Sequence, residues 1–103
     1  MNFSESRMKD FFQKNFLDVA RRNKILARWA AGRMGYDREQ SDAYVRNVIL
    51  GYLMSPNDRR MIRKILSDFN DAKVTLSEDD IRAKLAAIEL RLGSSKSFAS
   101  NRG

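Results

Sequence analysis

Helical periodicity is the feature that most constrains this 103-residue chain. Apolar residues recur every three to four positions, and no segment shows the alternation of a half-buried strand. Capping residues, glycines and one proline divide the pattern into helices at residues 4–35, 37–55, 56–69 and 77–93. Because short links make consecutive helices antiparallel neighbours, we predict an all-α fold, a small four-helix bundle.

The helix boundaries follow from capping chemistry. Asp37 begins the second helix and forms a capping box with the glutamine three residues later. Ser55 is predicted to cap the third helix, with Pro56 at its first position, where the missing N–H costs nothing. Ser77 caps the fourth helix ahead of three acidic residues that suit the positive end of the helix dipole. Gly93 is predicted to end it.

Each helix carries an apolar stripe that we predict to face the interior. The stripes are Ile25, Leu26, Trp29, Ala30 and Met34; Val45, Val48, Ile49 and Tyr52; Ile62, Ile65, Leu66 and Phe69; and Ile81, Leu85, Ile88 and Leu92. Residues 20–93 would then form the bundle, and residues 1–19 an N-terminal arm continuous with the first helix. Residues 94–103 are rich in serine, charged and aperiodic, which predicts a disordered tail.

Composition excludes several kinds of site. The chain has no cysteine and no histidine, so thiolate chemistry, histidine bases and the commonest metal ligands are absent. No carboxylates are spaced for acid–base work and no glycine-rich loop could hold a phosphate. We therefore expect a protein that is not an enzyme, without metal or cofactor. The polar N-terminus and the short longest apolar run, residues 48–54, predict a cytoplasmic protein without membrane insertion.

The net charge of +7 is concentrated at the front, where residues 1–35 hold eight basic against three acidic residues. Its densest part is the group Arg21, Arg22, Lys24, Arg28 and Arg33. Such a run is usually the solvated outer face of a helix, but it could also bind an anionic partner. Together with the basic third helix it leaves a small nucleic-acid-binding protein as an alternative.

Four phenylalanines fall within the arm, interleaved with basic residues, a composition that a solvated helix would not carry. Two accounts fit it equally. The arm folds back as extra packing on the bundle, or its aromatic anchors enter a groove of another protein. The candidate partner-binding residues are Phe3, Arg7, Phe11, Phe12, Lys14, Phe16, Arg21 and Arg22.

Three stretches together resemble a known family. They read ARRNKILARWAAGRMGY, then AYVRNVILGYLMSP, then MIRKILSDFNDAKVTLSEDDIRAKL, and they span Ala20 to Leu85 almost without interruption. In this order and spacing they resemble the alphaproteobacterial zeta subunit, the small inhibitor of the F1-ATPase of ATP synthase.

The resemblance implies a four-helix bundle that carries an N-terminal arm. In the family the arm inserts at a catalytic interface of F1-ATPase and blocks rotation in the hydrolytic direction. Its pattern falls here on Phe3, Arg7, Phe11, Lys14 and Phe16. The implied partners are the alpha, beta and gamma subunits of F1, at the inner membrane. The free protein is expected to be a monomer.

The arm departs from the family pattern. Only Leu17, Asp18 and Val19 separate it from the ARRN stretch, whereas family members carry a longer charged segment there. A divergent paralogue with a shortened arm and no inhibitory activity is therefore a second alternative, beside the nucleic-acid-binding protein.

Overall fold

The computed structural model describes the backbone of residues 2–102 and the side chains of residues 16–93. Four helices account for most of it: α1 (Asn2–Arg33), α2 (Arg38–Met54), α3 (Asp58–Asp71) and α4 (Glu78–Arg102). Residues 2–102 contain no strand. The all-α, four-helix prediction is confirmed.

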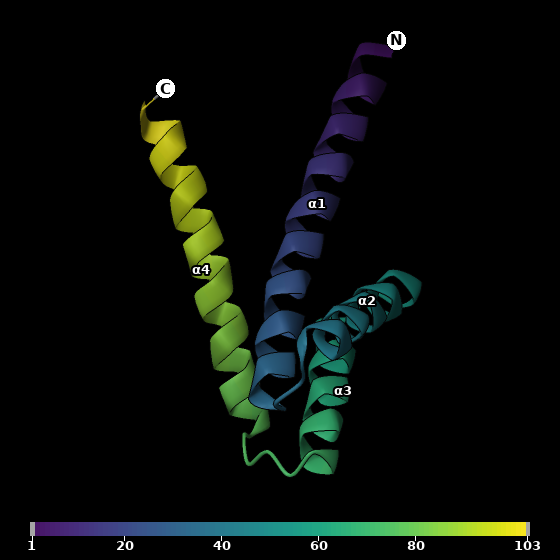
Figure 1. Ribbon diagram of the computed structural model, residues 1–103. Helices are drawn as coiled ribbons and strands as arrows, with labels where there is room; N and C mark the ends of the chain where they lie inside the picture. The colour runs from purple at the N-terminus through teal and green to yellow at the C-terminus, as the bar shows by residue number, and fades with distance from the viewer. Residues whose placement is uncertain (1, 103) are drawn as a thin grey trace.

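The helices meet at one end of an elongated molecule of 54 × 31 × 25 Å. α1 and α4 are the long ones, and they diverge toward the end where both termini lie, while α2 and α3 pack at the other end (Figure 1). With a rise of about 1.5 Å per residue, the 32 residues of α1 extend over about 48 Å. The N-terminal half of α1 therefore reaches beyond α2 and α3.

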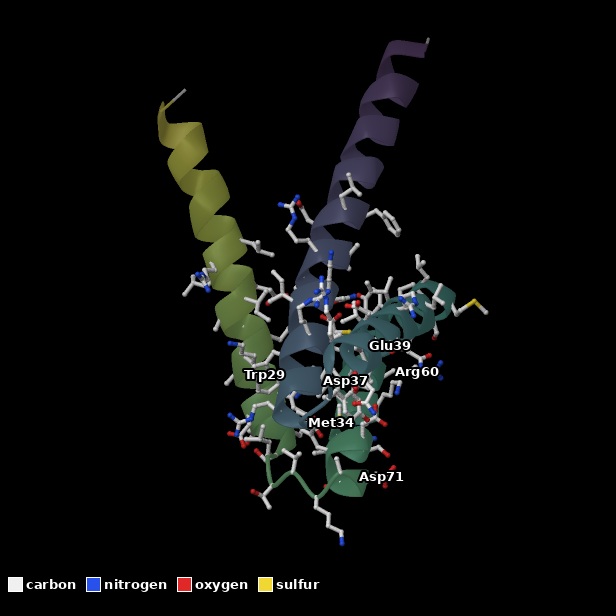
Figure 2. The ribbon with its side chains drawn as sticks, in the orientation of Figure 1. Trp29, Met34, Asp37, Glu39, Arg60 and Asp71 are labelled. Carbon is white, nitrogen blue, oxygen red and sulfur yellow. The ribbon has the colours of Figure 1, made fainter. Side chains whose placement is uncertain are left out.

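The core lies where the four helices meet (Figure 2). Its buried apolar residues are Leu26, Ala27, Ala30, Ala31, Tyr44, Val45, Val48, Met61, Ile62, Ile65, Phe69, Ile81, Leu85 and Ile88. Three alanines on α1 leave room for close approach of the neighbouring helices. Trp29 is partly buried against this core and meets the Phe69 ring edge-on, with centroids 5.8 Å apart. The predicted interior is confirmed for most positions, but Ile25 is 40% exposed and was assigned wrongly.

Most predicted helix ends are confirmed. The backbone N–H of Gln40 donates to Asp37 Oδ1 at 2.8 Å, and the return bond completes the capping box. Ser77 caps α4 in the same way, with Asp80 as its reciprocal partner. Gly35, at φ +76°, ends α1 with the paired hydrogen bonds of a Schellman motif.

Two predicted boundaries are wrong. Ser55 does not cap α3: its N–H donates to the Gly51 carbonyl and closes α2, and Asn57 caps α3 by accepting from the Arg60 N–H at 3.0 Å. Pro56 accounts for the end of α2 at Ser55, since the residue before a proline is driven out of the helical region. Gly93 does not end α4, which continues to Arg102.

A glycine inside a helix weakens it by about 1 kcal/mol without forcing an end. The side chains of residues 94–103 lie outside those described, so the disordered tail stays a prediction.

Candidate partner-binding site

The arm forms the N-terminal part of α1, which crosses the predicted division between residues 19 and 20 without a break. The side chains of Phe3, Arg7, Phe11, Phe12 and Lys14 lie outside the described residues, so their role in partner binding stays a prediction. The backbone is helical through all five positions. Phe16 is the first of the candidate residues whose side chain is described.

Phe16 is 51% exposed and borders a groove of about 470 Å³. We call this hollow the α1–α2 groove. It is lined by Phe16, Val19, Ala20 and Asn23 of α1, Ile49, Tyr52 and Leu53 of α2, and Pro56 of the following link. Apart from the Asn23 amide and the Tyr52 hydroxyl, the lining is apolar. It therefore offers contact by shape and hydrophobic burial rather than by charge.

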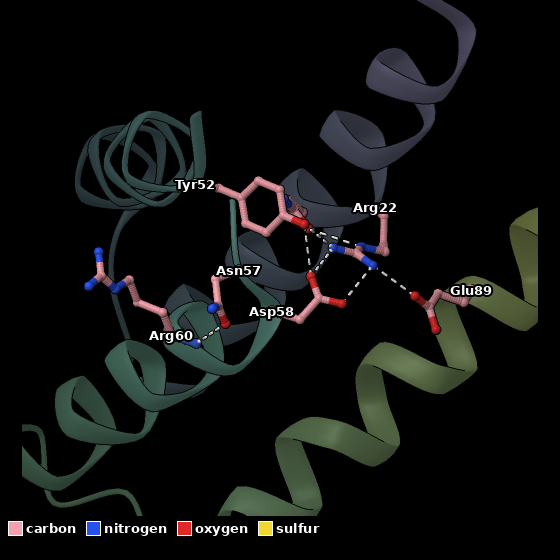
Figure 3. A network of polar contacts seen from close by, with 7 residues as sticks. Arg22, Tyr52, Asn57, Asp58, Arg60 and Glu89 are labelled. Carbon is pink, nitrogen blue, oxygen red and sulfur yellow. Dashed lines mark hydrogen bonds and ion pairs between the residues drawn. The ribbon is translucent and has the colours of Figure 1, made fainter. Parts of the chain in front are cut away.

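The base of the arm is fixed to the bundle by Arg22, which is only 9% exposed (Figure 3). Its guanidinium bonds Asp58 through two nitrogens, at 2.7 and 3.2 Å, and Glu89 at 2.8 Å. Nε donates to Asn23 Oδ1 at 3.0 Å, and the Tyr52 hydroxyl donates to Asp58 at 2.9 Å. One arginine thus links α1 to α2, α3 and α4.

The electrostatics of this cluster favour its charged form. Burial alone would lower the pKa of Arg22, but hydrogen bonds to Asp58 and Glu89 raise it above its usual value. Burial likewise pushes the Asp58 pKa upward, and the bonds from Arg22 and Tyr52 more than reverse this, leaving it lowered. Burial and the bond to Asp58 raise the Tyr52 pKa. At neutral pH the arginine and the aspartate are therefore both ionised.

The basic group predicted as an outer face divides in two. Arg22 does not lie on an outer face, because its side chain points into the bundle, and its role as a partner-binding residue stays a prediction. A signal was available: Arg22 precedes Leu26 and Ala30 by one and two turns, so all three share the buried face of α1. Arg21, Lys24 and Arg33 are exposed, and Arg28 is exposed beside Asp42 at 3.5 Å.

The charge around the bundle is unbalanced. Within residues 16–93 the exposed side chains of Arg21, Lys24, Arg46, Arg59 and Arg60 form no ion pair. Figure 2 shows Arg60 on the outside of α3. These exposed, unpaired side chains suit an anionic partner.

The described part of the chain contains neither a metal-binding group nor a membrane-spanning helix. No group of three or more acidic residues there could hold a metal ion. None of the helices searched among those residues is long and apolar enough to cross a bilayer.

Comparison with known proteins adds one finding. A model of the family described as ATPase inhibitor subunit zeta matches residues 3–91, which include the arm and nearly all of the bundle. No curated protein and no solved structure matches the chain.

Proposed function

Because the chain belongs to the ATPase inhibitor subunit zeta family, we propose that it binds F1-ATPase and inhibits ATP hydrolysis with the N-terminal arm of α1. The observation that carries this proposal is the family match, which begins at residue 3 and so takes in the arm. The protein would act in the cytoplasm, on F1 at the inner membrane.

The proposed mechanism is steric. A helix that extends beyond its own bundle can enter an interface between subunits, as Phe16 and the phenylalanines before it become buried in the partner. Catalysis in such an interface requires closing motions, and aromatic side chains wedged into it would prevent them. Hydrolysis would then stop without any chemistry from the inhibitor. We place the arm between alpha and beta subunits, near gamma.

The bundle supports this mechanism as a carrier. Arg22, Tyr52, Asp58 and Glu89, which we call the Arg22 cluster, join the four helices at the base of the arm. The arm therefore extends from a fixed base. The exposed basic side chains on the same molecule would attract an acidic surface and speed association.

Adding the purified full-length chain to F1 from the same organism and measuring ATP hydrolysis tests the proposal. We expect the rate to fall as the protein saturates F1. A variant with both Phe11→Ala and Phe12→Ala should need at least ten times more protein for the same effect, since each large aromatic anchor contributes on the order of 2 kcal/mol.

Leu90→Ala, an exposed position on α4, is the matched control and should behave as the unaltered chain. Full hydrolysis at saturating protein would instead identify a paralogue that lacks inhibitory activity.

A further inference from the structure

The apolar surface at the base of the arm extends beyond the α1–α2 groove. On α2, Leu50, Leu53 and Met54 expose 59%, 47% and 86% of their surface. Their spacing places them on one face of the last two turns. Phe16 faces the same hollow from α1. Single exposed apolar residues are ordinary, but a group of them around a groove marks an interaction site.

Two exposed basic side chains lie next to this surface. Arg46 lies one turn before Leu50, and Lys24 lies one turn after Ala20, which lines the groove. Neither forms an ion pair within residues 16–93. The carboxylate nearest in the structure to the groove-lining Tyr52, that of Asp58, is already bound by Arg22 and Tyr52. An occupant would therefore meet apolar walls with positive charge beside them.

We propose that the α1–α2 groove binds an amphipathic helix of F1, with apolar residues entering the groove and acidic residues on its flanks. This inference rests on the proposed function, since the partner is the one that the arm contacts. A volume of about 470 Å³ lies in the range of specific binding sites, and a groove between two helices suits anchors spaced at i, i+4 and i+7. Phe16 belongs to both surfaces, so the arm's partner would reach the groove directly.

Substitutions at Leu53 test the site in the full-length chain. Leu53→Glu should raise the Kd for F1 at least tenfold, because it places a carboxylate against an acidic, apolar ligand. Leu53→Lys should cost less, since its ammonium can pair with the acidic flank. Leu90→Glu, at a leucine 72% exposed on α4, is the matched control and should leave the Kd unchanged.

A second variant covers the case in which Leu53→Glu does not fold. Arg46→Glu changes an exposed side chain only and should weaken binding several-fold at low salt, with a smaller effect at high salt. An unchanged Kd for both Leu53→Glu and Arg46→Glu would overturn the groove proposal while leaving inhibition by the arm intact.

Hydrogen exchange separates this proposal from the proposed function. Adding F1 should slow exchange in residues 16–23 and 49–56. If F1 binds and protects these segments without losing activity, the groove proposal stands and the inhibitory function falls. If F1 binds and the exchange rates of both segments do not change, the groove proposal is overturned. Protection that grows with the concentration of the free protein overturns it too, because a second copy would then fill the groove. Failure to bind F1 overturns both.

Discussion

At the scale of single residues, Arg22 has the largest structural role of any charged side chain described. It makes the bidentate contact with Asp58 that lysine cannot make, together with a bond to Glu89. Arg22→Ala would leave both carboxylates without their cation. Removing one member of a fully buried pair costs about 3–5 kcal/mol, but these carboxylates are about half exposed, so we expect a loss of about 1–3 kcal/mol.

Urea denaturation measures this free energy of unfolding. Arg21→Ala, at the exposed neighbouring position, is the control and should change it by less than about 0.5 kcal/mol. Equal effects from the two variants would mean that the Arg22 cluster contributes nothing specific.

The lowered pKa of Asp58 gives the same cluster a pH dependence. Its pKa lies below 3.8 in the folded protein and near 3.8 when unfolded. The stability from its ionised form is therefore fully present only well above the unfolded-state pKa, and it is lost as the pH falls through the folded-state pKa. We expect Asp58→Asn to destabilise the protein at pH 6 and to differ less from the unaltered chain at pH 2. Denaturation across this range checks it, and a constant difference would contradict it.

At the scale of secondary-structure elements, the ends of α1 and α3 use the same turn with different residues. Gly35 takes the left-handed conformation after α1, and Lys73 takes it after α3 at φ +60°. Only glycine adopts this conformation without steric cost, which is about 1 kcal/mol for other residues. Lys73→Gly should therefore raise the free energy of unfolding by about 0.5–1 kcal/mol. Gly35→Ala should lower it by about 1 kcal/mol, with no clash, since a Cβ there meets nothing within 4 Å.

Thermal unfolding of the two variants compares them directly. A lower melting temperature for Lys73→Gly would mean that the lysine side chain contributes more than its backbone strain costs.

The same scale shows what could be predicted from the sequence. Capping boxes and apolar stripes are local patterns, and they correctly predicted the start of α2 at Asp37 and the start of α4 at Ser77. The start of α3 was not predicted correctly, because the three-residue link offers two candidate caps, and Ser55 closes α2 while Asn57 caps α3. Local sequence patterns identify candidate caps, but the path of the chain between two packed helices determines which candidate is used.

Features formed by several helices together could not be predicted from local sequence patterns. Arg22 could be placed on the buried face of α1, yet its partners Tyr52, Asp58 and Glu89 lie 30, 36 and 67 residues away with no pattern to connect them. The α1–α2 groove likewise forms only when two helices pack. A partial signal existed in α2, where Leu50 and Leu53 lie outside the predicted apolar face and so indicated a second contact surface.

At the scale of the whole molecule, the proposed function requires the arm and the bundle to act as one rod. α1 runs from Asn2 to Arg33 without interruption, so the direction of its N-terminal half is set by packing at its C-terminal half. Gln13→Pro would break this continuity, because proline removes a backbone hydrogen bond and clashes with the preceding turn, at a cost of about 3 kcal/mol to the helix. Bundle stability should not change, since the buried residues described begin at Arg22.

Inhibition of F1 hydrolysis by Gln13→Pro should therefore require at least ten times more protein, while its melting temperature equals that of Gln13→Ala. The alanine variant keeps the helix and serves as the control. If the proline variant inhibits as well as the alanine variant, the arm acts as a flexible ligand whose direction does not matter. The bundle would then contribute attachment alone, and the Arg22 cluster would matter for stability but not for inhibition.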